Sequence, residues 1–334
     1  MRNWVHDMIE NPRKKPLPIL SFPAASLMGI TVRELVQNST LQAEAMKRIA
    51  DRVDPAAAVS LMDLSVEAEA FGAEIRFTED EIPTVVGALV ADEDAAEALE
   101  IPQIGAARTG IYLDGVKKAL ELIPDRPVFA GSIGPYSLAG RLLDVGQAMI
   151  LCYEEPDMVH TVMEKATAFL ISYIQAYKAL GAHGVLLAEP LTGMLSPALA
   201  EEFSSPYVKQ IIDAVQDENF LVIYHNCGDN VLFMADSIVS CGAGAYHFGN
   251  AIDLSKMLPK VPSDCLVMGN VDPAGVICHG TPEQVQAETC RIMEACSHAK
   301  NFCISSGCDI PPASPWENID AFFDAADRFY HTHG

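Results

Sequence analysis

Basic residues are scarce in this 334-residue sequence, which has 22 Lys plus Arg against 45 Asp plus Glu and a formal net charge of −23 at pH 7. A surface of this sign repels phosphate backbones and anionic lipid headgroups. The balance therefore argues against nucleic acid or a membrane surface as the main partner, and solubility is the usual reason for such an acidic excess.

Several other features are missing. No apolar run reaches the roughly 18 residues that a membrane helix needs, and the amphipathic pattern after Met1 leads us to expect no cleavable leader. We find no internal repeat, low-complexity tract or Gly/Ser-rich linker. The nine cysteines are odd in number and scattered, which is typical of a reducing cytosol rather than of a disulfide framework. We expect a cytoplasmic protein in which residues 1–334 form a single domain.

The motifs of nucleotide and serine-hydrolase chemistry are absent as well. The sequence has no Gly-x4-Gly-Lys-[Ser/Thr] loop and no Gly-x-Gly-x-x-Gly between a strand and a helix. It also lacks the Gly-x-Ser-x-Gly nucleophile elbow. The chemistry of this chain must therefore come from other residues.

Short apolar runs alternate with stretches of helical periodicity along the chain. This alternation predicts a parallel sheet, and eight strand–helix units favour a closed (β/α)8 TIM barrel over an open sheet. Residues 66–90 are expected to form a small N-terminal β-hairpin excursion outside the main sheet. Helices are expected, among others, at 31–51 and 197–216. The strands are expected at residues 16–23, 56–62, 127–131, 184–188, 220–225, 245–248, 265–268 and 302–305.

Polar side chains follow the predicted strands at their carboxyl ends, where the active sites of such barrels lie. For any single one, an ordinary polar loop residue is an equally good interpretation. Six at one kind of position favour a shared site. They are Asp63, Glu189, His225, Cys227, Asp272 and Cys308.

The apolar run 221–224 leads directly into His225 and Cys227 and ends at Gly228. Side chains two apart on a strand share a face, so the imidazole and the thiol can point at one place. Nitrogen and sulfur are ligands that zinc prefers. Because His-x-Cys also occurs by chance and strand-end cysteines are often small buried apolar residues, the pair alone is weak support for a metal.

Cys308 strengthens the zinc hypothesis. It is too far along the chain for a local zinc-finger pair, yet it too lies just past the end of a predicted strand. Three protein ligands leave one coordination position open, which is typical of catalytic rather than structural zinc. By contrast, we interpret Cys152, Cys290 and Cys296 in helical stretches, and Cys303 inside a strand, as core residues.

These motifs resemble those of a known family. His225-x-Cys227…Cys308, Gly269-Asn270-x-Asp272-Pro273 and Ser305-x-Gly307-Cys308 are similar to the methylcobalamin:coenzyme M methyltransferases, a branch of the uroporphyrinogen decarboxylase superfamily. The stretches 22–25, 29–34, 67–72 and 131–135 are similar too, so the resemblance covers nearly the whole chain.

The resemblance implies a barrel with a catalytic zinc at its mouth, held by His225, Cys227 and Cys308. It also implies a methylated corrinoid as methyl donor and a small thiol as acceptor. The Asp-x-His-x-x-Gly motif that supplies an axial histidine in corrinoid-binding modules is absent. We therefore expect a separate corrinoid carrier protein as partner rather than tightly held cobalamin, and we leave a homodimer open.

The implied chemistry fits these ligands. A free thiol has a pKa of about 8.5, so little of it is thiolate at neutral pH, and a zinc ion removes its proton. Two cysteine thiolates already on the metal offset its charge, so the guest sulfur stays nucleophilic and can attack the methyl group on cobalt.

Further residues are candidates by position. Some relatives offer a glutamate as fourth ligand where this chain has Tyr246 to Asn250, and His247 could take that place or be a satisfied pocket histidine or substrate contact. Asp63, Glu189, Asn250 and Asp272 are candidates for lining the pocket or orienting ligands, with loop-holding hydrogen bonds as the alternative. The identity of the acceptor thiol, coenzyme M or another, is left open.

Four rival functions were weighed. Uroporphyrinogen decarboxylase acts on a carboxylate-rich substrate that calls for arginines at the cleft, and residues 21–30, which match its arginine-rich stretch, have none. The second rival is a corrinoid carrier, whose Asp-x-His-x-x-Gly motif is absent from this chain. The third is a protein with a non-catalytic metal, which would need a closed four-ligand site. The last rival demethylates a methylated substrate onto a corrinoid protein; the His-x-Cys…Cys pattern favours the thiol-acceptor direction.

Overall fold

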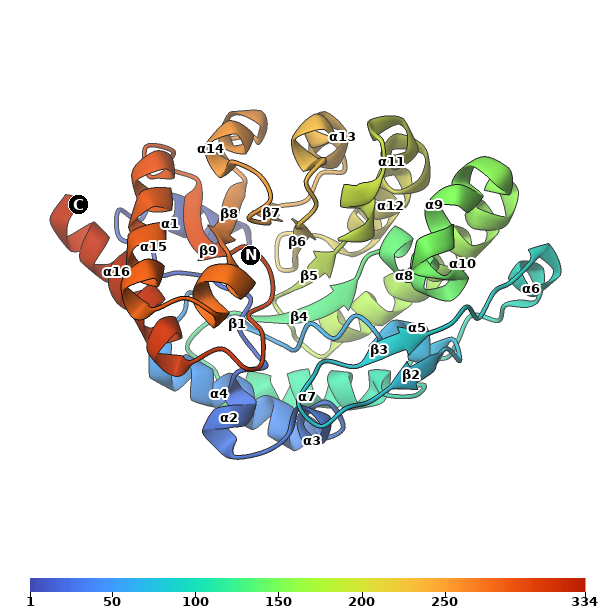
Figure 1. Cartoon of the computed structure of the whole chain (residues 1–334), viewed down its shortest axis with the longest axis horizontal. Coiled ribbons are helices and arrows are strands. Elements are labelled where there is room, and N and C mark those ends of the chain that lie inside the picture. The colour runs from blue at the N-terminus through green and yellow to red at the C-terminus, as the bar shows by residue number, and fades with distance from the viewer. Residues whose placement is uncertain (334) are drawn as a thin grey trace.

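The structure is a computed structural model that describes residues 1–333. Within these residues, seven parallel strands form one curled sheet in the order β1-β4-β5-β6-β7-β8-β9, with helices around it (Figure 1). The arrangement is that of an α/β, TIM-like barrel. The strands are β1 (Ala58–Val59), β4 (Val128–Ile133), β5 (Gly184–Ala188), β6 (Leu221–Asn226), β7 (Ala245–Phe248), β8 (Leu266–Val271) and β9 (Phe302–Ser306).

The strand expected at 16–23 is not formed. An extended segment lies there instead, between β9 and β1: Leu17 N donates to Ile304 O over 3.1 Å, and Pro16 O accepts from Ala56 N over 2.9 Å. Pro16, Pro18 and Pro23 lack N–H groups, which prevents a repeating ladder. The segment therefore takes the place of an eighth strand without becoming one.

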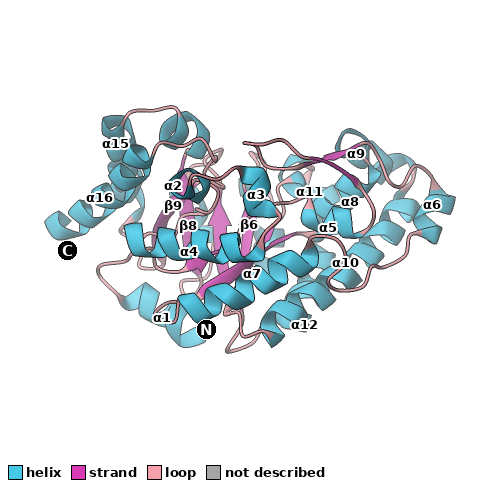
Figure 2. Ribbon diagram, turned by 90° about the horizontal axis from the view of Figure 1, so that it is seen from below, coloured by secondary structure: helices cyan, strands magenta, loops and turns pink. Residues whose placement is uncertain are grey.

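Helices cover the outside of the sheet (Figure 2). The longest, α10 (Pro156–Ala179), buries side chains such as Val162, Phe169 and Tyr173 against it. The other helices are α1 (Arg2–Glu10), α2 (Ala24–Met28), α3 (Val32–Val36), α4 (Ser39–Val53), α5 (Val66–Ala70), α6 (Glu93–Ala98), α7 (Thr109–Leu122), α8 (Pro135–Leu143), α9 (Val145–Glu154), α11 (Pro197–Phe203), α12 (Ser205–Val215), α13 (Ala235–Ser240), α14 (Leu254–Met257), α15 (Pro282–Cys296) and α16 (Trp316–His333), with the short helical turns η1 (Leu191–Met194), η2 (Val231–Phe233), η3 (Leu258–Lys260) and η4 (Pro273–Cys278).

Two expected helices are each divided. The stretch 31–51 forms α3 and α4, because Asn38 Oδ1 accepts from Thr40 N and Leu41 N and so starts a new helix. The stretch 197–216 forms α11 and α12, with a proline in the first turn of the second helix. In both cases a local start signal interrupts a continuous apolar pattern.

A two-stranded antiparallel sheet lies apart from the barrel sheet, between β1 and β4 in the chain. It pairs β2 (Glu74–Arg76) with β3 (Thr84–Val86). The segment that follows β3 is tied to the end of α8, because Leu89 N and Val90 N both donate to Leu142 O over 2.9 Å. These elements and α6 lie on the right-hand side of Figure 1.

The barrel interior is apolar and closed at one end. Phe129, Ile223 and Met268 belong to a buried cluster that also includes Val5 and Met8 of α1. Helix α1 thus covers the amino ends of the strands, and the carboxyl ends form the mouth. Cys152, Cys290, Cys296 and Cys303 lie in α9, α15 and β9. Among residues 1–333, no helix has the length and apolarity to cross a bilayer.

Candidate metal centre

Strand β6 brings His225 to the mouth. All six of its residues are buried, as expected for a strand with neighbours on both edges and packing on both faces. The chain then turns, and Asn226 Oδ1 accepts from Gly228 N over 3.0 Å. Cys227 lies in this turn, just past the strand end. Cys308 lies in the corresponding turn after β9, where Gly307 N donates to Val271 O over 2.6 Å.

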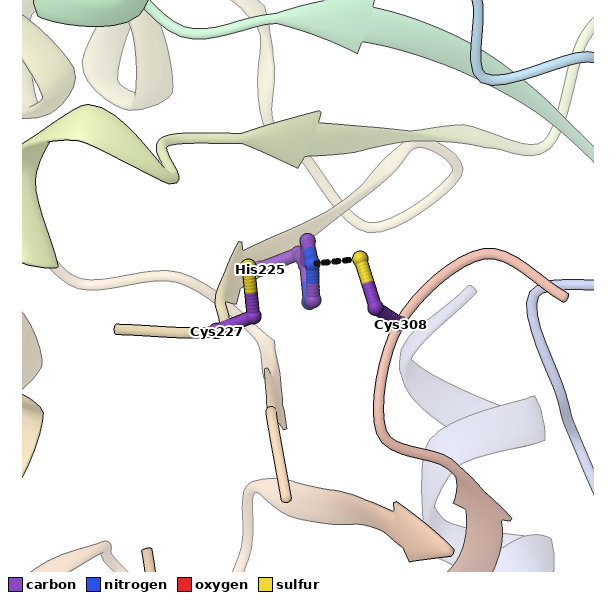
Figure 3. Close-up of side chains that lie close together, drawn as sticks. All are labelled: His225, Cys227 and Cys308. Atoms are coloured by element: carbon purple, nitrogen blue, oxygen red, sulfur yellow. Dashed lines mark hydrogen bonds between the residues drawn. The ribbon is translucent and has the colours of Figure 1, made fainter. Parts of the chain in front are cut away.

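The three predicted ligands meet across the mouth (Figure 3). His225 Nε2 lies 3.5 Å from Cys308 Sγ, and the ligand atoms of His225, Cys227 and Cys308 all lie within 4.8 Å of one another. Ligand atoms around a tetrahedral zinc are about 3.5–3.8 Å apart, given its usual bond lengths. The donor set therefore fits zinc, and within the described chain this group has three members.

The two sulfurs influence each other. The Cys308 thiol as hydrogen-bond donor lowers the pKa of Cys227, whereas the same contact and burial raise the pKa of Cys308 well above its ordinary value. The pair therefore favours one thiolate beside one thiol. A cation between the sulfurs would favour two thiolates.

A chain of hydrogen bonds sets the tautomer of His225. Ser305 Oγ donates to Leu17 O over 2.7 Å, so it must accept at its 2.7 Å contact with His247 Nε2. His247 therefore carries its proton on Nε2, and its bare Nδ1 accepts from His225 Nδ1 over 2.8 Å. Burial, which lowers the pKa of His247 well below its ordinary value, keeps this ring neutral. His225 is thus left with a bare Nε2 that faces the sulfurs, which is the form that binds a metal.

His247 lies outside the three-member group. Both of its ring nitrogens are hydrogen-bonded, one to His225 and one to Ser305, and its side chain is buried. Ser305 was not selected as a site residue from the sequence, although it stands in the Ser305-x-Gly307-Cys308 motif. Its role depends on contacts with residues far away in the chain.

Two glycines allow the ligand loops to approach each other. A Cβ at Gly249 would lie 2.5 Å from the Cα of Cys227, and a Cβ at Gly307 would lie 2.5 Å from Asn250 Oδ1. No real Cβ tolerates such distances. The loop after β7 therefore packs against both cysteine-bearing turns, and the predicted site residue Asn250 is exposed beside the turn of Cys308.

Glu189 holds two loops in place. Its carboxylate is fully buried and accepts from Tyr136 N at 2.7 Å, Ser137 N at 3.0 Å and Thr192 Oγ1 at 3.1 Å. Burial raises the pKa of Glu189 to about 7, against the effect of these donors. Ser137 also donates its hydroxyl to Glu189 over 2.7 Å. Glu189 thus fixes the start of α8 and the turn η1.

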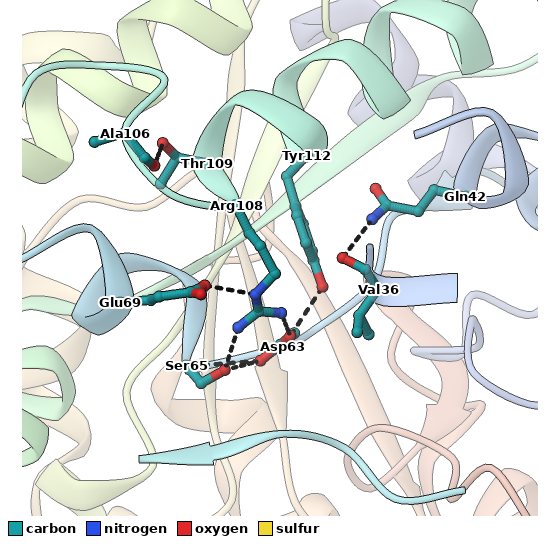
Figure 4. A network of polar contacts seen from close by, with 9 residues as sticks. All are labelled: Val36, Gln42, Asp63, Ser65, Glu69, Ala106, Arg108, Thr109 and Tyr112. Atoms are coloured by element: carbon teal, nitrogen blue, oxygen red, sulfur yellow. Dashed lines mark hydrogen bonds and ion pairs between the residues drawn. The ribbon is translucent and has the colours of Figure 1, made fainter. Parts of the chain in front are cut away.

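Asp63 is committed to a buried network at the end of β1 (Figure 4). It forms an ion pair with Arg108, and it accepts from Tyr112 at 3.0 Å and from Ser65 Oγ at 2.6 Å. Arg108 also donates to Glu69. Removing one partner of such a buried pair leaves a charge unpaired and is strongly destabilising. The network joins β1 to the start of α7.

The hydrogen bonds of Asp272 do not reach His225, Cys227 or Cys308. Its Oδ1 accepts from Ala274 N and Gly275 N, at 3.0 and 2.9 Å, and so caps the turn η4. Asp309, by contrast, was missed from the sequence. Both of its carboxylate oxygens are buried without a partner, and burial raises its pKa well above the ordinary value. Its position directly after Cys308 was the signal that could have drawn attention to it.

The family model described as "Uroporphyrinogen decarboxylase (URO-D)" matches residues 19–329. The chain belongs to this family. The predicted resemblance is confirmed, because relatives of both expected kinds are found within the family.

A uroporphyrinogen decarboxylase of Desulfotalea psychrophila is 27% identical over 304 residues, covering 89% of this chain and 87% of that protein. A methylcobamide:CoM methyltransferase, MtbA, of Methanosarcina mazei is 26% identical over 274 residues, covering 80% and 78%. A solved methyltransferase from Methanosarcina mazei has a TM-score of 0.86 at 23% identity and covers 98% of both chains, which supports the fold. Decarboxylases and methyltransferases are thus both among the relatives of this URO-D protein.

Proposed function

We propose that this URO-D family protein is a zinc-dependent methyltransferase. It would move a methyl group from methylcobalamin, or from a methylated corrinoid protein, to a small thiol. The observation that carries the proposal is the group formed by His225, Cys227 and Cys308, whose ligand atoms lie within 4.8 Å of one another. We further propose that the chain is a single closed barrel domain, with residues 16–20 in the eighth position.

The residues of the chain suit this chemistry. His225 offers a bare Nε2, because Ser305 and His247 hold the proton on its other nitrogen. With a cation bound, Cys227 and Cys308 would supply two negative charges. A zinc ion bound by these three residues would ionise a substrate thiol and orient it, while the two thiolates keep that sulfur electron-rich.

The transfer itself is a displacement at carbon. The lone pair of the substrate sulfur forms the new sulfur–carbon bond, and the carbon–cobalt bond breaks with both electrons going to cobalt. The departing corrinoid needs no proton, because cobalt keeps the electron pair, and the proton of the thiol would leave to solvent when the sulfur binds zinc. Coenzyme M is a candidate acceptor, since the MtbA relatives are named for it.

Two alternatives use the same barrel. Demethylation of a methylated substrate onto a corrinoid protein differs in the direction of transfer, and the His-x-Cys…Cys pattern favours the thiol-acceptor direction. Decarboxylation of uroporphyrinogen is the activity named for other relatives, but residues 21–30 have no arginine, and the buried Arg108 is already paired with Asp63 and Glu69. A carboxylate-rich substrate would find few free cations here.

The test is a spectroscopic assay. The zinc-loaded protein is mixed with methylcobalamin and a thiol such as 2-mercaptoethanesulfonate, and cobalamin absorbance and thioether formation are followed together. We expect turnover in the wild type and its loss, with loss of bound zinc, in Cys308→Ala. Cys290→Ala, in helix α15, is the matched control. Equal turnover in wild type and Cys308→Ala would overturn the proposal, and so would decarboxylation of uroporphyrinogen without methyl transfer.

A further inference from the structure

Exposed apolar side chains gather at one part of the barrel mouth. Of the eleven large hydrophobic residues that are exposed in residues 1–333, two lie at the carboxyl ends of α7 and α10, beyond the amino ends of the strands. The other nine follow the carboxyl ends of four neighbouring strands, β1, β4, β5 and β6. They are Val86, Leu89, Ile101, Ile104, Val145, Ile150, Tyr153, Met194 and Phe233, which we call the mouth patch.

The mouth patch exposes its aromatic members most. Phe233 is 78% exposed, Tyr153 is 71% exposed and Met194 is 53% exposed. Single exposed apolar residues are ordinary, but a concentration of large ones at one place marks an interaction site. Tyr, Phe and Met are also the residue types enriched at the centre of protein interfaces.

Hydrogen bonds link the four loops of the patch in sequence around the mouth. Leu89 N donates to Leu142 O at the end of α8, next to α9. Leu191 N, in η1, donates to Ser137 Oγ of α8 over 3.1 Å, so η1 lies beside α8. Asn230 Nδ2, next to η2, donates to Leu195 O over 3.3 Å. Each loop is therefore a neighbour of the next around the mouth, and α6, β2–β3 and α9 lie on the right in Figure 1.

The segments that carry the patch contain acidic residues and no basic ones. The segments 77–107, 144–155, 189–196 and 227–234 hold eight, three, one and one Asp or Glu, and no Lys, Arg or His at all. From outside these segments, Arg33 pairs with Glu79 at 3.1 Å, and Lys165 Nζ donates to Ala96 O and Glu97 O at 2.7 and 2.6 Å. Apolar anchors within a charged rim are the usual anatomy of a transient protein interface.

This charge decides between occupants. A second copy of the chain, docked by the same face, would place two acidic rims against each other, because a twofold interface joins identical patches. Nucleic acids and anionic membranes are repelled for the same reason. A small thiol or a free cofactor cannot cover four loops. The remaining occupant is a protein with a basic rim.

We propose that the mouth patch docks the protein that carries the methylated corrinoid, and that this carrier presents Lys and Arg around its cofactor. The inference rests on the proposed function. It agrees with the position of the ligands, because the Phe233 loop begins at Cys227 and a Cβ at Gly228 would lie 2.3 Å from Gly193 in the adjoining η1 turn. A partner seated on the patch therefore faces the opening above His225, Cys227 and Cys308.

The experiment compares two methyl donors. Rates are measured with free methylcobalamin and with a corrinoid carrier protein from the source organism, reconstituted with methylcobalamin, over a range of salt concentrations. The variants are Phe233→Ala, Tyr153→Ala and the triple change Glu93→Gln, Asp94→Asn, Glu97→Gln. A control triple, Glu121→Gln, Asp264→Asn, Glu294→Gln, removes the same charge from exposed positions elsewhere.

We expect each patch variant to lower the ratio of kcat/KM for the carrier-bound donor to that for the free donor by about tenfold. The acidic triple should also flatten the salt dependence with the carrier, whereas the control triple should not. Equal loss with both donors, equal effects in the control triple, or patch-dependent self-association would overturn this inference. Failure of the wild type with free methylcobalamin and every thiol would instead overturn the proposed function.

Discussion

Replacing His247 by alanine tests the hydrogen-bond chain that prepares His225 for metal binding. In the folded protein, His225 Nδ1–H donates to His247 Nδ1 over 2.8 Å, and His247 is only 1% exposed. Without this acceptor, the Nδ1–H group of His225 is left buried and unpaired, which costs about 1–3 kcal/mol. The ring can avoid that cost by moving its proton to Nε2, where it blocks the metal.

Both outcomes, an unpaired Nδ1–H group and a proton moved to Nε2, lower the affinity of His225 for zinc. Removing the group that orients a ligating histidine lowers metal affinity by about 10- to 100-fold, which corresponds to about 1.4–2.7 kcal/mol. Ser305→Ala should have a smaller effect in the same direction, because it removes the partner of His247 rather than that of His225. His160→Ala serves as control, since His160 bonds Tyr207 over 2.7 Å in the helical layer, away from the ligands.

The assay is a zinc titration in competition with a chromophoric chelator, together with nitrogen NMR of the imidazole rings in zinc-free protein. Two results would refute the reasoning. One is the same zinc affinity in His247→Ala and His160→Ala. The other is a wild-type spectrum in which the proton of His225 resides on Nε2, because that tautomer contradicts the direction assigned to every bond in the chain.

Three further predictions concern other residues near the mouth. Gly249→Ala should lower zinc affinity at least about tenfold in the same titration, because its Cβ would lie 2.5 Å from Cys227. Glu67 is fully buried, and burial raises its pKa from 4.5 to about 7. The stability that Glu67 contributes is therefore full below about pH 4.5 and lost by about pH 7. In urea unfolding, the free energy of unfolding of the wild type should fall by about 3 kcal/mol more than that of Glu67→Gln over this pH range. Asp309→Asn should raise the free energy of unfolding at pH 8 by about 1–2 kcal/mol, because the buried carboxylate it removes has no partner.

Each of these has a clear contrary result. Zinc affinity unchanged in Gly249→Ala would show that the loop after β7 can move away from Cys227. A pH dependence of unfolding identical in Glu67→Gln and wild type would mean that this carboxyl titrates alike in both states. A lower unfolding free energy in Asp309→Asn would show that its oxygens have a partner in solution.

The amino-acid sequence by itself determined many of the local elements and the end of the barrel at which the candidate ligands lie. The strands expected at 184–188 and 245–248 coincide with β5 and β7, because continuous apolar runs bounded by polar residues and glycine have few other conformations. The capping box of Thr31 and Glu34 also forms, since it depends on residues three apart. The rule that parallel strands end on one face was enough to place His225, Cys227 and Cys308 at one end of the barrel.

Tertiary structure alone decided how those elements meet. Strands β7 and β8 lie between β6 and β9 in the sheet, so only the curl of the sheet brings Cys308 across to His225. The partners of His247 and Glu189 come from distant segments, and no periodicity encodes which donor meets which acceptor. The extended segment 16–20 and the mouth patch likewise depend on neighbours. Sequence patterns report burial and strand direction, whereas distances between strand ends follow from how the whole sheet closes.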